Sequence, residues 1–88
     1  MSFRVVVTRT AARELAEHLP EAVAAACVEL LFGPLADNAH RAGAALRPTL
    51  AGQWRARRGE YRIRYRIGDA ERVVYVLDID HRRDAYGS

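Results

Sequence analysis

Apolar residues at every second position predict strands at both ends of the chain. Residues 3–8 are rich in valine, and from residue 53 onward the period is two, with Gly59 and Glu60 turning the chain between two such stretches. The predicted strands are residues 3–8, 53–58, 61–67 and 72–79. The last of these has apolar residues on both faces, which favours a central position in a sheet.

Between these strands the apolar residues recur at helical spacing. Pro20 suits the first turn of a second helix, and Gly33 followed by Pro34 ends it. Residues 34–50 have no clear period and predict a long connecting loop. The apolar helix faces consist of Ala12, Leu15, Ala16 and Leu19 and then of Val23, Cys27, Leu30 and Leu31.

The order of these elements predicts an α+β fold in a single domain, residues 1–88. It has an N-terminal strand, a two-helix hairpin and a three-stranded antiparallel meander, with the helices packed on one face of a four-stranded sheet. No apolar run approaches the ~20 residues that span a bilayer, so no membrane partner is expected. The single cysteine, Cys27, allows no internal disulfide, and with three scattered histidines it predicts no metal site. We therefore expect a cytoplasmic protein.

The positive charge is concentrated in one third of the chain. Residues 41–66 contain eight arginines against one acid, Glu60, for a balance of +7, whereas the whole chain carries only +3. Residues 1–40 and 67–88 each carry a balance of −2. Such a basic segment predicts a polyanionic partner.

The phase of the alternation places these arginines on one face of the sheet. If Tyr61 to Ile67 pack their apolar members under the helices, the arginines between them face outward, and those of the preceding strand lie beside them. The resulting cluster is Arg55, Arg57, Arg62, Arg64 and Arg66. Like charges side by side destabilise a sheet, and a phosphate-rich ligand would remove the repulsion. The alternative is that solvated arginines pair with Glu60, Asp69 and the acids of strand 72–79.

A second group of chemically capable residues follows the last strand. His81 could transfer protons near neutral pH, and Tyr86 could stack on a base. The alternative is a frayed tail of mixed charge.

Three segments together resemble the RelE/ParE superfamily of type II toxin–antitoxin toxins. They are residues 5–11 (VVVTRTA), 50–65 (LAGQWRARRGEYRIRY) and 79–86 (IDHRRDAY). The resemblance implies a RelE-type endoribonuclease that cuts messenger RNA in the ribosomal A site and inhibits translation. It also implies a cognate antitoxin and no cofactor. The RNA's own 2′-hydroxyl would attack without a metal, leaving a 2′,3′-cyclic phosphate and a 5′-hydroxyl.

The same resemblance implies the site. Its core is Arg55 and Arg57 before the hairpin, Arg62 within it, then Arg82 and Tyr86. We expect the catalytic residues to be Arg57, Arg62, His81, Arg82 and Tyr86, and the RNA-binding residues to be Arg47, Arg55, Arg58, Arg64 and Arg66.

The sequence departs from the family at one position and leaves alternatives open. Some members have lysine where Arg57 stands, and arginine, which keeps its proton, cannot be a general base. Either Arg57 only stabilises charge, or proton transfer falls to another group such as His81 or Glu60. The competing functions are a ParE-type toxin, which shares the fold but poisons DNA gyrase, and a non-catalytic RNA-binding or inactive homologue.

Overall fold

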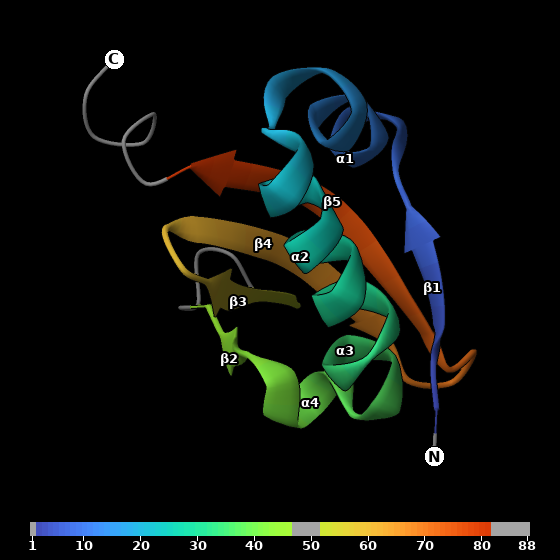
Figure 1. The fold of residues 1–88 in the computed structure, drawn as a ribbon. Helices are drawn as coiled ribbons and strands as arrows, with labels where there is room; N and C mark the ends of the chain where they lie inside the picture. The colour runs from blue at the N-terminus through green and yellow to red at the C-terminus, as the bar shows by residue number, and fades with distance from the viewer. Residues whose placement is uncertain (1, 47–51, 82–88) are drawn as a thin grey trace.

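The computed structural model describes residues 2–46 and 52–81. One strand, a series of helices and then four further strands follow one another along the described chain (Figure 1). In chain order the elements are β1 (Arg4–Val7), α1 (Arg9–Arg13), the π-helical turn η1 (Glu14–His18), α2 (Glu21–Phe32), α3 (Pro34–Asp37), α4 (Ala39–Ala42), β2 (Ala44–Ala45), β3 (Gln53–Arg58), β4 (Tyr61–Gly68) and β5 (Val73–His81).

The strands form one mixed sheet in the order β1-β5-β4-β3-β2. β1 runs parallel to β5, and the other neighbours are antiparallel. The α+β class, the four predicted strands and the interior position of β5 are confirmed. No helix in the described part of the chain is long and apolar enough to cross a membrane.

The prediction of one long loop over residues 34–50 is wrong for its described part. This segment forms α3, α4 and β2, and β2 adds a fifth strand to the four that were predicted. The Asn38 side chain accepts a hydrogen bond from the Arg41 backbone and caps α4. At Gly43 a Cβ would collide with the Arg55 carbonyl oxygen and the Tyr65 hydroxyl. Elements of two to four residues are too short to show a period, so the alternation could not reveal them.

The core lies between α2 and the sheet. On α2, Cys27, Leu30 and Leu31 are buried, and Figure 1 shows this helix crossing one face of the sheet. The sheet residues packed in the same cluster include Ala56, Ile63, Tyr65, Val74, Val76 and Ile79. Burying them removes apolar surface from water at roughly 25 cal/mol per Å². The opposite face of β3 and β4 is left for the arginines.

A bulge interrupts the pairing of β4 with β5. Arg64 is opposite Asp78, but the next residue, Tyr65, is opposite Val76, so Leu77 has no partner in β4. One extra residue reverses the alternation of side chains along the rest of β5. Asp78 and Asp80 therefore lie on the arginine side of the sheet, while Ile79 is buried on the helix side.

Candidate nucleic-acid interface

The register of the β3–β4 hairpin brings the predicted arginines together. Arg55 is directly opposite Arg64, and Arg57 is directly opposite Arg62. Arg66 lies further along β4, opposite Gln53. We call the face that carries Arg55, Arg57, Arg62, Arg64 and Arg66 the arginine face. This register confirms the predicted β3–β4 hairpin and the prediction that these arginines lie on the face of the sheet opposite the helices.

Acidic side chains from β5 reach the same face. Arg64 donates a hydrogen bond to Asp78, and Arg62 is opposite Asp80. The side chain of Asp78 is 18% exposed, and burial raises its pKa while the Arg64 charge opposes that shift. One oxygen of Asp78 and the Nε of Arg64 are buried with no hydrogen-bond partner among the described residues. The alternative of pairing with strand acids therefore holds for Arg64.

A hollow of about 170 Å³ opens in the middle of this face. It is lined by Leu46, Arg55, Arg62, Arg64 and Asp80. Three arginines therefore line a space that accommodates a phosphate-sized anion. A guanidinium group can bind phosphate oxygens with two parallel hydrogen bonds, whereas that of Arg64 already donates to Asp78. One carboxylate, that of Asp80, is also at its wall.

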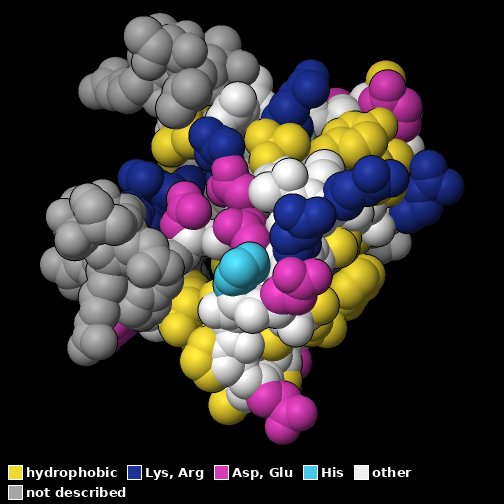
Figure 2. Space-filling view, turned by 90° about the horizontal axis from the view of Figure 1, so that it is seen from above, with side chains coloured by type: hydrophobic (Ala, Val, Ile, Leu, Met, Phe, Trp, Pro, Cys, Tyr) yellow, Lys and Arg dark blue, Asp and Glu magenta, His cyan; other side chains and the backbone are white. Residues whose placement is uncertain are grey.

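The charges around this part of the molecule are mixed rather than uniformly positive. Arg55, Arg62 and Arg64 share the hollow with Asp80, and the view from above in Figure 2 likewise shows acidic side chains grouped between basic ones. Because an anionic ligand is attracted by the arginines and repelled by the carboxylates, such a surface favours a defined position of the ligand over nonspecific adhesion.

Two side chains from the segment that follows β1 hold the bulged strand in place. The Thr8 hydroxyl donates to the carbonyl oxygens of Val76 and Leu77, at 2.7 and 3.1 Å. The Glu14 carboxylate accepts a hydrogen bond of 2.8 Å from the Ile79 backbone. Burial raises the pKa of Glu14, and the charges of two nearby aspartates add to the shift, whereas the Ile79 hydrogen bond lowers it. These contacts fix the segment that carries Asp78 and Asp80.

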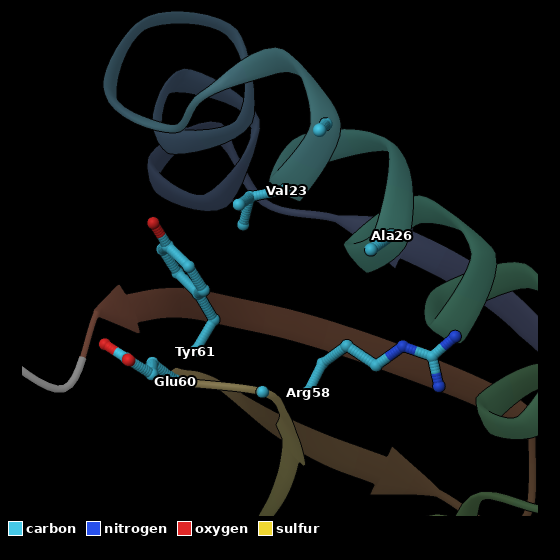
Figure 3. A pocket seen from close by; sticks show the side chains of 7 residues that line it. Val23, Ala26, Arg58, Glu60 and Tyr61 are labelled. Carbon is cyan, nitrogen blue, oxygen red and sulfur yellow. The ribbon is translucent and has the colours of Figure 1, made fainter.

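Arg58 lies apart from the other predicted arginines. It is on the helix side of β3, with its Nη2 3.9 Å from a carboxylate oxygen of Glu29 on α2. It lines a separate hollow of about 570 Å³ between α2 and the β3–β4 turn, where Tyr61 points toward Val23 (Figure 3). Glu60 also lines this second hollow. The structure therefore does not bring Arg58 or Glu60 to the arginine face.

The remaining predicted residues are at or beyond the limits of what is described. His81 is the last residue of β5, and its backbone is paired with Tyr61; its side chain is outside the described part. Arg47, Arg82 and Tyr86 lie outside the described residues. Sequence reasoning considered Asp78 only as an ion-pair partner of the arginines and assigned no role to Asp80. The sequence signal that could have pointed to them is that they stand next to the C-terminal His-Arg segment. The sheet face on which they lie, however, depends on the bulge in β5.

Comparison with known proteins places this geometry in a family. A family model described as the ParE toxin of the type II toxin–antitoxin system parDE matches residues 5–86. Toxin RelE of Mycobacterium tuberculosis is 49% identical over 84 residues, covering 96% of this chain and 86% of the relative. The chain belongs to the RelE/ParE family of type II toxins. Toxin RelG of the same organism is 46% identical, with 98% of each chain covered.

Solved structures of RelE/ParE toxins agree with the fold. The toxin–antitoxin complex RelBE2 of M. tuberculosis contains a chain with 45% identity and a TM-score of 0.87, covering 93% of this chain and 100% of that one. A free E. coli RelE mutant superposes with a TM-score of 0.79 at 18% identity, covering 98% and 88%, and so supports the fold alone. The resemblance to this family that the sequence motifs indicate is confirmed.

Proposed function

We propose that this toxin is a ribosome-dependent endoribonuclease that cleaves messenger RNA in the A site and so stops translation in the cytoplasm. The observation that carries the proposal is the hollow in the arginine face, where Arg55, Arg62 and Arg64 converge. Arg57 is next to it, directly opposite Arg62. The similarity to toxins named RelE and RelG supports the same activity.

In the proposed reaction the RNA supplies its own nucleophile. The 2′-oxygen attacks the adjacent phosphorus, the bond from phosphorus to the 5′-oxygen breaks, and a 2′,3′-cyclic phosphate and a 5′-hydroxyl result. Negative charge grows on the phosphate oxygens as the bond forms, and fixed guanidinium groups stabilise that charge most in the transition state. In this proposal Arg62 and Arg57 stabilise the charge, and Arg55 holds the RNA backbone. Arg82 and Tyr86 remain part of the proposal from the family resemblance.

The proposed protein partner is a cognate antitoxin. The similar M. tuberculosis toxin was solved in a complex named RelBE2, and a Pyrococcus horikoshii RelE with 22% identity and a TM-score of 0.63 was solved with RelB. For this chain we expect an acidic or amphipathic segment, disordered when free, that covers the arginine face. A neutralising partner that leaves Arg55 and Arg62 accessible would contradict this arrangement.

The decisive experiment is single-turnover cleavage of ribosome-bound message by variants of matched chemistry. Arg62→Ala removes a charge-assisted contact worth roughly 1.5–3 kcal/mol, and more in a site that excludes water, so cleavage should fall by at least about 10-fold to 100-fold. Arg4→Ala removes an exposed arginine from β1, the far edge of the sheet, and should cleave as the wild type does. Thermal unfolding of both variants checks that the fold is retained. Equal cleavage by the two variants would refute the assignment.

A gyrase poison of the ParE type is the second candidate, because the matching family model is described as a ParE toxin. The two functions share a fold, so activity must separate them. Supercoiling by purified DNA gyrase and cleavage of ribosome-bound message should be measured with the same wild-type preparation. Inhibition of gyrase together with intact message would replace the nuclease proposal.

A further inference from the structure

The geometry points to Asp80 as the general base that takes the proton from the attacking 2′-hydroxyl. This inference rests on the proposed ribonuclease function and supplies the group that the arginines cannot provide. The Asp80 side chain lines the hollow in the arginine face together with Arg55, Arg62 and Arg64. Its residue is exposed, and it is opposite Arg62 in the register of β4 and β5.

The bulge at Leu77 is the reason why Asp80 is there. Ile67 is opposite Val74 and Tyr65 is opposite Val76, so unbroken pairing would continue with Ile63 opposite Asp78 and Tyr61 opposite Asp80. Both aspartates would then lie on the helix side with Ile63, which is fully buried. The extra residue moves them to the arginine face instead. Bulges frequently re-aim side chains near active sites.

The bulge is held by side-chain contacts from Thr8, which also caps the N-terminus of α1, and from Glu14. The Thr8 hydroxyl donates to the carbonyl oxygens of Val76 and Leu77, and the Glu14 carboxylate accepts from the Ile79 backbone N–H. A carboxylate that is partly removed from water is costly unless its hydrogen bonds compensate. The Ile79 N–H holds the Glu14 carboxylate of η1 against β5, one residue before Asp80. This hydrogen bond fixes the register of the segment that carries Asp80. Thr8 and Glu14 are thus positioning residues for Asp80.

The other candidate bases in the described part of the chain are less suitable. Asp78 is occupied by Arg64 and mostly buried. Glu60 lines the other hollow, between α2 and the β3–β4 turn. Arginine keeps its proton and cannot accept another. Asp80 is the one carboxylate among the described residues that line the hollow of the arginine face.

The proton and electron movements balance without a further reactant. A carboxylate oxygen of Asp80 takes the 2′-hydroxyl proton while the 2′-oxygen forms its bond to phosphorus. The bond from phosphorus to the 5′-oxygen breaks, and the electron pair goes to the 5′-oxygen, which takes a proton from water. Asp80 then returns its proton to solvent. The neighbouring Arg62 stabilises the phosphate charge during the same step.

The test compares Asp80→Asn, Asp80→Glu and the control Asp37→Asn, which removes an exposed carboxylate from α3. General-base catalysis contributes about 10²-fold to 10⁴-fold, so Asp80→Asn should lower single-turnover cleavage at saturating ribosomes by at least about 10²-fold. Ribosome binding should be equal or tighter, because a negative charge has been removed. Asp80→Glu should recover part of the rate, and Asp37→Asn should match the wild type.

The pH dependence of the same rates provides a second readout. General-base catalysis makes the rate depend on the protonation state of the base, so the pH–rate profiles of the wild type and of Asp80→Asn should differ in shape. Cleavage by Asp80→Asn at or above the wild-type rate would overturn the inference and would mean that Asp80 only competes with phosphate. If the wild type itself does not cleave, the proposed function fails instead.

Discussion

The two faces of the β3–β4 hairpin are built from alternate residues of the same strands, yet their environments are opposite. On the helix face Ala56, Ile63 and Tyr65 are between 0 and 2% exposed. On the arginine face the facing positions are Arg55 opposite Arg64 and Arg57 opposite Arg62. One face loses its contact with water, whereas the other keeps charged groups close together at some cost to the sheet.

This difference indicates that stability and function are assigned to different faces and can be changed separately. A core side chain contributes through apolar area and packing, which no charge on the other face replaces. An arginine contributes little to folding while it remains solvated, but it is available to a phosphate ligand. Adjacent residues of β4 should therefore differ sharply in the effect of the same substitution.

The largest expected contrast is between Ile63→Ala and Arg62→Ala. Ile63 is fully buried, so its truncation removes apolar contacts and leaves a cavity, which costs about 2–5 kcal/mol of unfolding free energy. The neighbouring Arg62 is only half-buried and leaves no apolar cavity when it is truncated, so Arg62→Ala should cost about 1 kcal/mol or less. Urea unfolding of both variants measures the difference. Similar midpoints would show that the two faces are not separable.

The ion pair between Arg64 and Asp78 is an exception within the arginine face and should give the next largest effect. Arg64→Ala leaves the mostly buried carboxylate without its partner, which costs roughly 1–3 kcal/mol. In the double variant Arg64→Ala/Asp78→Ala, both charges are gone and part of the loss should be recovered. A double-mutant cycle on the unfolding free energy measures this coupling. A double variant no more stable than Arg64→Ala would count against a structural role for the pair.

The Asp78 carboxyl should also make stability depend on pH, by a smaller amount because Arg64 offsets part of its burial. Burial raises its pKa above the ordinary value of 3.8 in the folded protein. The native state then keeps the proton to higher pH than the unfolded chain does, so stability falls as pH rises from about 3.8 to the raised value. The fall should be smaller in Asp78→Asn. Urea midpoints of the wild type and of Asp78→Asn should be measured across this pH window. If both midpoints change equally with pH, the pH dependence does not come from Asp78.

The contrast between the faces was predictable, but the acids within the arginine face were not. Regular alternation from Tyr61 to Ile67 specifies which side chains are buried, and the hairpin register follows from the Gly59 turn, where φ is +62°. Residues 73–77 of β5 are all apolar, so no alternation indicates where the register shifts. The face of Asp78 and Asp80 depends on contacts from Thr8 and Glu14, some 65 to 69 residues away in sequence. Such contacts leave no local pattern.

Arg58 shows the reverse case, in which the alternation of strand residues is enough to predict its side of the sheet. It comes directly after Arg57, and successive strand residues point to opposite faces, so the alternation already implied the helix side for it. Its place among the expected RNA-binding residues came from the basic composition of the segment. In the structure Arg58 lies near Glu29, on the helix side of β3.

The smallest expected effect belongs to Arg58→Ala. Its guanidinium is half exposed and 3.9 Å from an exposed Glu29 carboxylate, and pairs of this kind contribute about 0.2–1 kcal/mol. Because Arg58 faces α2 and not the hollow that contains Arg62, its removal should leave cleavage of ribosome-bound message within about twofold of the wild type. Arg57→Ala, one residue earlier on the arginine face, should lower cleavage by at least about 10-fold through the loss of a charge-assisted contact. Both variants should unfold within about 1 kcal/mol of the wild type, so the comparison concerns activity alone. A loss of cleavage in Arg58→Ala equal to that in Arg57→Ala would mean that RNA contacts both sides of the hairpin, and the separation of the two faces would have to be given up.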